Sequence, residues 1–119
     1  MTHQRKVLGK WGEEKAKEYL LNQGYILIAQ NWRTRYGELD LIMLDQETVV
    51  FVEVRTKSTS DFGKASESIH HRKQQKLLYT AEAFLTSKKW WNRNVRFDLI
   101  SIDKIEGKYQ IQHIKNIIH

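Results

Sequence analysis

The chain has 119 residues, 40% of them hydrophobic and 29% charged, which suffices for one globular domain over residues 1–119 with its own core. It contains no cysteine, which excludes disulfides, thiolate metal sites and cysteine nucleophiles. Twenty lysines and arginines stand against 14 acids, and the formal net charge of +6 favours a polyanionic partner, usually nucleic acid. With no membrane-spanning apolar run and no visible leader, we expect a cytoplasmic protein without a membrane partner.

The first predicted element is an amphipathic helix over residues 5–22. At about 100° per residue, its apolar and small residues share one side, namely Leu8, Trp11, Gly12, Ala16, Tyr19 and Leu20. Gly24 follows as the expected C-terminal cap, because glycine readily adopts the left-handed conformation that ends many helices. The β-branched and aromatic residues of 25–32 then predict a strand.

Two further strands, 38–44 and 48–55, flank a polar stretch at 45–47 and predict a hairpin. The second strand is apolar on both faces at residues 49–52. That pattern is typical of a central strand whose sheet is covered on both sides.

A second helix is expected over residues 68–87, and strands over 95–102 and 109–114. One side of this helix carries the apolar residues Leu77, Leu78, Ala81, Phe84 and Leu85. The terminal Ile117 and Ile118 are expected to pack on the sheet. The order helix, three strands, helix, two strands predicts an α/β fold with α/β/α layers.

The hairpin register predicts where two acids lie. If the turn is the four residues 45–48, Leu44 faces Val49, and Asp40 lies opposite Glu53 with Cβ atoms about 5 Å apart. Two like charges so placed cost stability. A divalent cation would compensate, because carboxylate oxygens suit Mg²⁺ or Mn²⁺.

Period-two spacing places Glu38, Arg55 and Lys57 on the same face as Asp40 and Glu53. A metal-dependent phosphodiesterase needs this combination, since acids hold the ion and cations stabilise the phosphoryl oxygens. The pattern fits equally a hairpin with solvated charged ends, in which Arg55 pairs with Glu53 or Asp40. A one-residue shift in the turn would separate the two acids.

Both predicted helices carry further candidate residues for this group of charged side chains. Glu13 lies at the rim of the first helix's apolar side, where it either leans towards the carboxylates or stays in solvent. Gln74 and His70 fall within the apolar side of the second helix. Gln74 either orients a water or a phosphate, or satisfies backbone groups.

Cations and aromatic residues suited to nucleic acid surround these positions. Trp90 and Trp91 follow a basic stretch and either stack on unpaired bases or cap the core. The cations near the proposed site are Arg33, Arg35, Arg55, Lys57, Arg72, Lys73 and Lys76.

The sequences GELDLI at residues 37–42 and FVEVRTK at residues 51–57 resemble the bacterial YraN-like family, also called UPF0102. Shorter matches extend the resemblance over nearly the whole chain, at residues 12–13, 19–20, 24–25, 72–74, 96–98 and 111–114. That family is similar to the PD-(D/E)XK nuclease superfamily, near the archaeal Holliday junction resolvases. The resemblance implies a restriction-endonuclease-like α/β/α core with a central mixed sheet flanked by helices.

The resemblance also implies site residues. Asp40 and Glu53 match the metal ligands of the superfamily, and Glu13 matches the helix glutamate of the resolvase-like branch. Gln74 matches a helix glutamine beside that site, and Glu38 belongs to the family's Gly-Glu-Ile-Asp motif.

One departure concerns the lysine of the (D/E)XK motif, which is Arg55 here. Arginine offers a bidentate fork to phosphate but cannot serve as a general base. If the reaction needs a lysine to shuttle a proton, turnover would be slow or absent unless Lys57, one strand repeat of about 7 Å away, reaches in.

We therefore expect an endonuclease that uses Mg²⁺ or Mn²⁺ to hydrolyse DNA phosphodiester bonds, with branched or structured DNA as a candidate substrate. The metal ligands would be Glu13, Asp40 and Glu53, with Arg55 or Lys57 stabilising the transition state and Gln74 positioning water. The alternative is a catalytically weak or inactive nucleic-acid-binding module on the same fold, and a third is a protein-interaction domain. A single site of this kind cuts one DNA strand at a time, so cutting of both strands would favour a homodimer. The sequence leaves the oligomeric state open.

Overall fold

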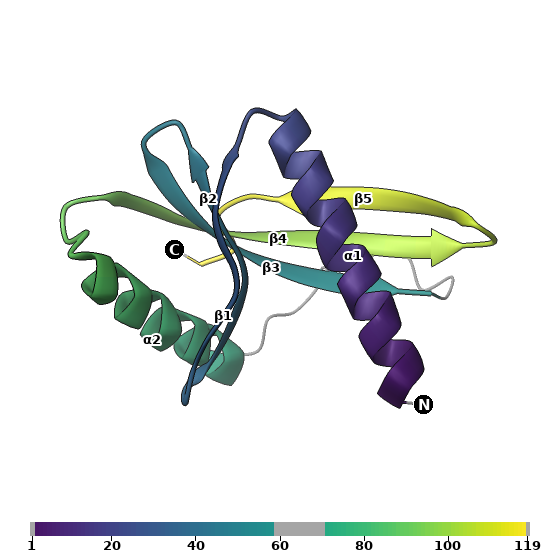
Figure 1. Cartoon of the computed structure of the whole chain (residues 1–119), viewed down its shortest axis with the longest axis horizontal. Coiled ribbons are helices and arrows are strands. Elements are labelled where there is room, and N and C mark those ends of the chain that lie inside the picture. Colours follow the sequence, from purple (N-terminus) through teal and green to yellow (C-terminus); the bar gives the residue numbers. More distant parts are fainter. Residues whose placement is uncertain (1, 59–70, 119) are drawn as a thin grey trace.

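The computed structural model describes residues 2–58 and 71–118, with side chains described over 6–58 and 72–118 (Figure 1). Its elements are α1 (Thr2–Asn22), β1 (Ile26–Thr34), β2 (Gly37–Asp45), β3 (Thr48–Lys57), α2 (His71–Lys88), β4 (Asn94–Ile105) and β5 (Lys108–Ile114). Every predicted helix and strand is present, although positions 68–70 of the second predicted helix, His70 included, lie outside the described residues. No described helix is both long and apolar enough to cross a membrane.

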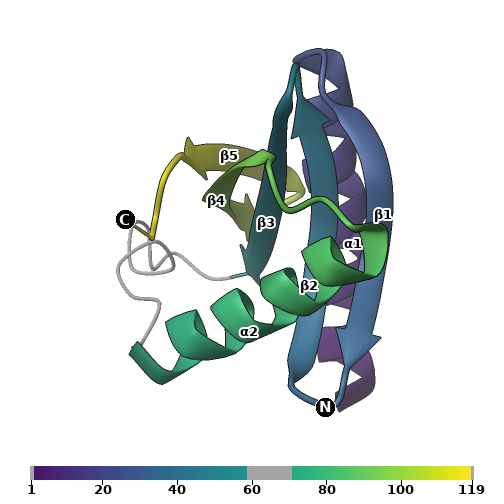
Figure 2. The same ribbon diagram turned by 90° about the vertical axis from the view of Figure 1, so that its left-hand side faces the viewer.

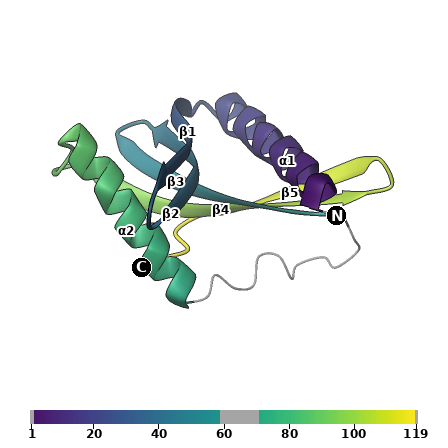
Figure 3. The same ribbon diagram turned by 60° about the horizontal axis from the view of Figure 1, so that its bottom comes forward.

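The strands form one mixed sheet in the order β1-β2-β3-β4-β5. Neighbours are antiparallel except β3 and β4, which run parallel. The apolar strand β3 is therefore central, as its sequence predicted. The helices α1 and α2 lie on opposite faces of the sheet, which confirms the α/β/α layering (Figure 3). This arrangement is consistent with a restriction-endonuclease-like core.

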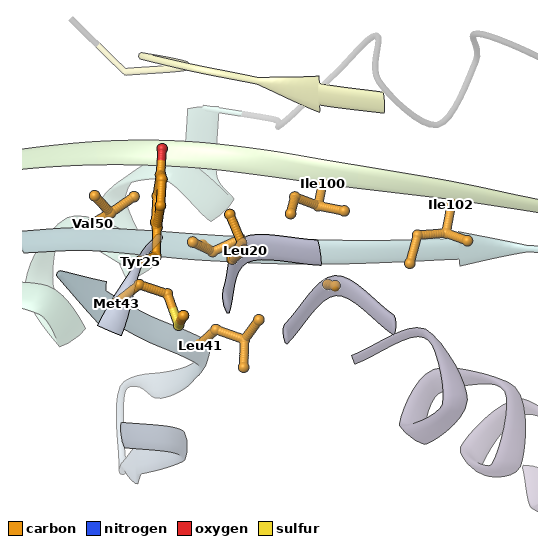
Figure 4. Close-up of a cluster of buried hydrophobic side chains, with 9 residues drawn as sticks. Leu20, Tyr25, Leu41, Met43, Val50, Ile100 and Ile102 are labelled. Carbon is orange, nitrogen blue, oxygen red and sulfur yellow. The ribbon is translucent and has the colours of Figure 1, made fainter. Parts of the chain in front are cut away.

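One face of the sheet is covered by α1. Its buried residues Ala16 and Leu20 pack among apolar side chains of the sheet, of which Figure 4 labels Leu41, Met43, Val50, Ile100 and Ile102. Gly24 ends the helix as predicted, with a φ of 94°. The Tyr25 N–H donates to the Leu20 carbonyl at 3.0 Å, and this closing turn directs the Tyr25 ring into the same cluster.

The other face is covered by α2, which crosses β2 obliquely (Figure 2). Phe84 is buried there and meets Phe51 edge-on, with ring centroids 6.0 Å apart. Trp90 caps this cluster against Phe84, whereas Trp91 is 69% exposed, so one tryptophan caps the core as expected. Ile118 also packs here, in agreement with the prediction for the C-terminal isoleucines.

The prediction was wrong for Leu78, which is 42% exposed. The buried stripe of α2 is narrower and runs through Leu77, Thr80, Ala81 and Phe84. Because this helix packs mainly against a single strand, residues at the edge of its apolar side remain in solvent.

Candidate functional site

The site begins where β2 and β3 separate. Their ladder runs from Asp45 opposite Thr48 to Leu41 opposite Val52, in the predicted register, and ends there. Asp40 comes next on β2. In place of a ladder bond, its Oδ2 accepts a hydrogen bond from the Val54 N–H at 2.9 Å, so the side chain bridges to β3.

A break in the strand pattern directs Asp40 towards β3. Leu39 and Leu41 are two residues apart on β2, yet Leu39 packs with α2 and Leu41 packs with α1. The register of β1 places Asn31 opposite Asp40, and Asn31 has a φ of 54°. Strict alternation, on which the prediction of one polar face depended, therefore fails at Asp40.

Three carboxylates converge at this point. One oxygen each from Glu13, Glu38 and Asp40 lies within 4.8 Å of the other two. Glu13 comes from α1, which approaches β3 closely because Gly12 has no side chain: a Cβ there would lie 1.9 Å from Thr56 Oγ1. Of the two placements that the sequence left open for Glu13, the structure has the one that leans towards the strand acids.

Glu53 reaches the same place from β3. It is 7% exposed and forms an ion pair with Lys73 of α2. A cavity of about 190 Å³ opens beside the pair and is lined by Gly37, Glu38, Asp40, Glu53, Lys73, Lys76, Leu77 and Thr80. Sequence reasoning had counted Lys73 only among the nearby cations, because nothing in its spacing shows that α2 turns it towards Glu53.

Two acids of this cluster, Glu13 and Asp40, have raised pKa values. Burial raises the pKa of Asp40 to about 8, the negative charge of Glu53 adds to the effect, and the hydrogen bond from Val54 opposes it. Burial also raises the pKa of Glu13, with a contribution from the charge of Glu38. Lys73 pairs with Glu53 and Arg33 pairs with Glu38, yet the pKa values of Glu13 and Asp40 remain raised. A bound cation beside these two acids would favour their ionised forms.

The remaining predicted site residues lie near this cluster. Arg55 and Lys57 follow Glu53 along β3, half-buried, opposite Ser101 and Asp103 of β4. Gln74 is half-buried on α2, next to Lys73. These three positions are not among the described residues that line the cavity, and their roles stay predictions.

A second buried charged network lies on the α1 side of the sheet. Asp98 of β4 is fully buried and accepts hydrogen bonds from Arg96 Nε at 2.9 Å and Nη2 at 3.0 Å. His113 Nε2 of β5 lies 2.8 Å from Asp98 Oδ2. Burial opposes ionisation of Asp98, but the hydrogen bonds with His113 and Arg96 outweigh it and lower the pKa of Asp98.

Arg96 extends this network to the hairpin and to the turn after α1. Its Nη1 donates to Asp45 at 3.1 Å and its Nη2 donates to the Tyr25 hydroxyl at 2.7 Å. Every polar partner in this network is a group of the protein itself. The network therefore ties together the start of β1, β2, β4 and β5 rather than presenting a binding site.

Comparison with known proteins gives one consistent result. The sequence profile of a family described as "Uncharacterised protein family UPF0102" matches residues 12–102 of this chain. A UPF0102 protein of Persephonella marina is 44% identical over 110 residues, covering 92% of this chain and 91% of the relative. Another, of Pseudomonas fluorescens, is 50% identical over 96 residues, covering 80% of each chain. A third, of Herpetosiphon aurantiacus, is 41% identical over 121 residues, covering 98% of each chain.

Proposed function

We propose that this chain, which belongs to the UPF0102 family, is a phosphodiesterase that uses Mg²⁺ or Mn²⁺ to cleave DNA. The observation that carries the proposal is the convergence of Glu13, Glu38 and Asp40 within 4.8 Å, with Glu53 beside them, where β2 and β3 separate. The resemblance of the surrounding motifs to PD-(D/E)XK nucleases supports the same chemistry.

The donor set suits a hard divalent cation. All candidate ligand atoms are carboxylate oxygens, which Mg²⁺ and Mn²⁺ prefer over nitrogen or sulfur. Glu13, Glu38 and Asp40 would hold the ion, and Glu53 would join them once Lys73 releases it. The ion would supply Lewis acidity, which lowers the pKa of water and neutralises charge on a phosphoryl oxygen.

Lys73 is the residue that we assign to the phosphate. In the metal-free protein its ammonium neutralises Glu53, while its side chain remains 46% exposed. With a cation held by the acids, Lys73 would be the residue placed to bind a phosphoryl oxygen at the cavity mouth. A lysine from α2 would then provide the amine that the motif lacks at Arg55, and Arg55 would keep a supporting positive charge.

The first test is calorimetric titration of Mn²⁺ into the wild type, an Asp40→Asn/Glu53→Gln variant, and a Glu82→Gln control that removes an exposed acid of α2 outside the cavity. We expect one Mn²⁺ site in the wild type and the control, and a loss of at least tenfold in affinity in the double variant. Equal binding by all three proteins would contradict the proposed site.

The second test is cleavage of a panel of duplex, branched and single-stranded DNAs with Mg²⁺ or Mn²⁺. Asp40→Asn should abolish cleavage and leave folding and DNA binding intact, and Lys73→Gln should slow cleavage without removing Mn²⁺ binding. Cleavage by Asp40→Asn at the wild-type rate would overturn the proposal.

The arginine at position 55 favours a second candidate, a nucleic-acid-binding module without turnover. It predicts DNA binding that weakens with salt, by about 0.9 in the log–log slope for each phosphate contacted, and no metal-dependent product. The cleavage panel separates the two candidates, because the binding module would shift the mobility of the DNA while leaving every strand intact.

A further inference from the structure

Two exposed tyrosines form a pair beside the acidic cavity. Tyr36 is 49% exposed and Tyr79 is 62% exposed, and their ring centroids lie 6.2 Å apart with an interplanar angle of 34°. Among the exposed aromatic residues that the structure describes, these two alone are in ring contact with each other. Such a pair leaves a large aromatic surface in water, which is typical of a recognition site rather than of a core.

The pair is placed at the cavity mouth by its neighbours in the chain. Tyr36 lies in the turn between β1 and β2 and is followed by Gly37, the first residue of β2. Tyr79 of α2 is followed by Thr80, and both Gly37 and Thr80 line the cavity. The two segments touch there, since a Cβ on Gly37 would lie 3.2 Å from Thr80 Oγ1. Thr80 is buried, and Tyr79, about 100° away around the helix, is turned outward.

The surroundings of the pair are cationic. The Arg35 guanidinium lies 5.1 Å from the centroid of the Tyr36 ring and donates to its hydroxyl at 3.1 Å. Lys73 and Lys76 line the adjoining cavity. Aromatic faces interleaved with cations suit a polyanion that carries flat rings, which describes an unpaired stretch of nucleic acid. A base inside a duplex keeps its faces stacked on its neighbours and is not available to these rings.

We propose that Tyr36 and Tyr79 form a stacking platform for an unpaired base next to the phosphate held at the acidic cavity. This inference rests on the proposed phosphodiesterase function and narrows its substrate to DNA with a single-stranded segment, such as a flap, an extension or a branch point. The structural source of specificity would be the aromatic pair, while the cavity handles the phosphate without regard to sequence.

The test compares the affinity of the protein for a duplex with a single-stranded extension and for the same duplex with blunt ends, at one salt concentration. All proteins carry Asp40→Asn so that the DNA stays intact. The added substitutions are Tyr79→Ala, Tyr79→Phe, which keeps the ring, and Tyr109→Ala, which removes an exposed aromatic residue of β5 outside the cavity. A 2-aminopurine at the first unpaired position reports stacking directly.

We expect Tyr79→Ala to raise the Kd for the extended DNA by roughly 5- to 150-fold and the Kd for the blunt duplex by less than about twofold. Tyr79→Phe and Tyr109→Ala should change neither Kd by more than about twofold. Quenching of 2-aminopurine fluorescence should be lost only in Tyr79→Ala. An equal loss on both DNAs, or no loss on either, would overturn the inference and leave the pair as a packing or protein-docking feature.

The failure of this inference is distinguishable from that of the proposed function. The stacking test needs no cleavage, whereas Mn²⁺ titration and the cleavage panel need no change at Tyr79. If stacking fails while Mn²⁺ binds and DNA is cut, the phosphodiesterase stands without the platform. If the protein binds neither DNA, both proposals fall.

Discussion

Two carboxylates of the sheet, the buried Asp98 and the half-buried Asp40, have surroundings that shift their pKa values in opposite directions. Asp98 receives hydrogen bonds from Arg96 and a close contact from His113, and its pKa is lowered despite burial. Asp40 receives one backbone hydrogen bond and otherwise faces other acids; burial and the charge of Glu53 raise its pKa to about 8. Both side chains come from strands of the same sheet.

The difference distinguishes a structural network from a candidate functional site. At Asp98 the protein supplies every partner, so ionisation stabilises the fold. At Asp40, burial and the charge of Glu53 outweigh the favourable contacts, so ionisation of Asp40 destabilises the fold unless something binds. Residues arranged against the stability of their own fold are characteristic of sites that bind or react.

The largest effect is expected from Asp98→Asn, which leaves Arg96, whose side chain is 15% exposed, without its main counter-charge. Removing one partner of a buried ion pair costs about 3–5 kcal/mol, a large share of the stability of a small domain. Urea unfolding at pH 7 measures this loss. Because the folded pKa of Asp98 is lowered, its contribution is present above the unfolded value near 4 and is lost as the pH falls through the folded value.

The same linkage gives a control. The stability difference between wild type and Asp98→Asn should shrink when unfolding is measured near pH 3 instead of pH 7. A constant difference across that range would show that the substitution acts through packing rather than charge.

At the acidic cavity we expect the opposite change in the free energy of unfolding: Asp40→Asn should stabilise the metal-free protein. The folded pKa of Asp40, about 8, lies above the unfolded value near 4, so its contribution to stability is present at low pH and is lost as the pH rises towards 8. The stability advantage of the Asp40→Asn protein over the wild type should therefore grow between pH 4 and pH 8, to the order of 1–3 kcal/mol. The amide oxygen of the substituted side chain can still accept the hydrogen bond from Val54.

Thermal unfolding across this pH range, with and without Mn²⁺, measures the effect. Mn²⁺ should raise the melting temperature of the wild type and leave that of Asp40→Asn unchanged, since a ligand stabilises only the state that binds it. An Asp40→Asn protein that is less stable than wild type at pH 8 would contradict the view that this cluster is strained.

Much of this site could be predicted from local pattern. The four-residue turn fixes the hairpin register as far as Leu41 opposite Val52, and that register brings Asp40 near Glu53, because register in a short antiparallel pair is a local property. The helix periodicity likewise placed Gly12 and Ala16 on the buried side of α1 and Glu13 at its rim. These inferences needed only neighbours in the chain.

The rest depends on how separate elements meet. The pairing of Lys73 with Glu53 follows from the angle of α2 over the sheet, which no periodicity encodes. Period-two spacing placed Glu38 beside Asp40, but its approach to Glu13 depends on how α1 packs over the strands. The contact between Asp98 and His113 joins β4 and β5, whose register is set by a turn with two positive-φ residues. The sequence around Asp98 does not show that His113 is its partner.

The smallest expected effect comes from alanine substitutions at two glycines of α1, which test how Glu13 reaches the other acids. A Cβ on Gly9 would meet nothing within 4 Å, whereas one on Gly12 would lie 1.9 Å from Thr56 Oγ1. Gly9→Ala should therefore stabilise the protein by up to about 1 kcal/mol through helix propensity. Gly12→Ala should destabilise it by about 1 kcal/mol, because overpacking exceeds the same propensity gain.

The functional readout of this pair is Mn²⁺ affinity. Gly12→Ala must push α1 away from β3 and carry Glu13 away from Glu38 and Asp40, so Mn²⁺ should bind more weakly than to Gly9→Ala. Adding Thr56→Ala to Gly12→Ala removes the atom that the new methyl group would strike and should restore part of both stability and affinity. If Gly12→Ala loses stability but keeps wild-type Mn²⁺ affinity, Glu13 is not a ligand, and the metal rests on the strand acids alone.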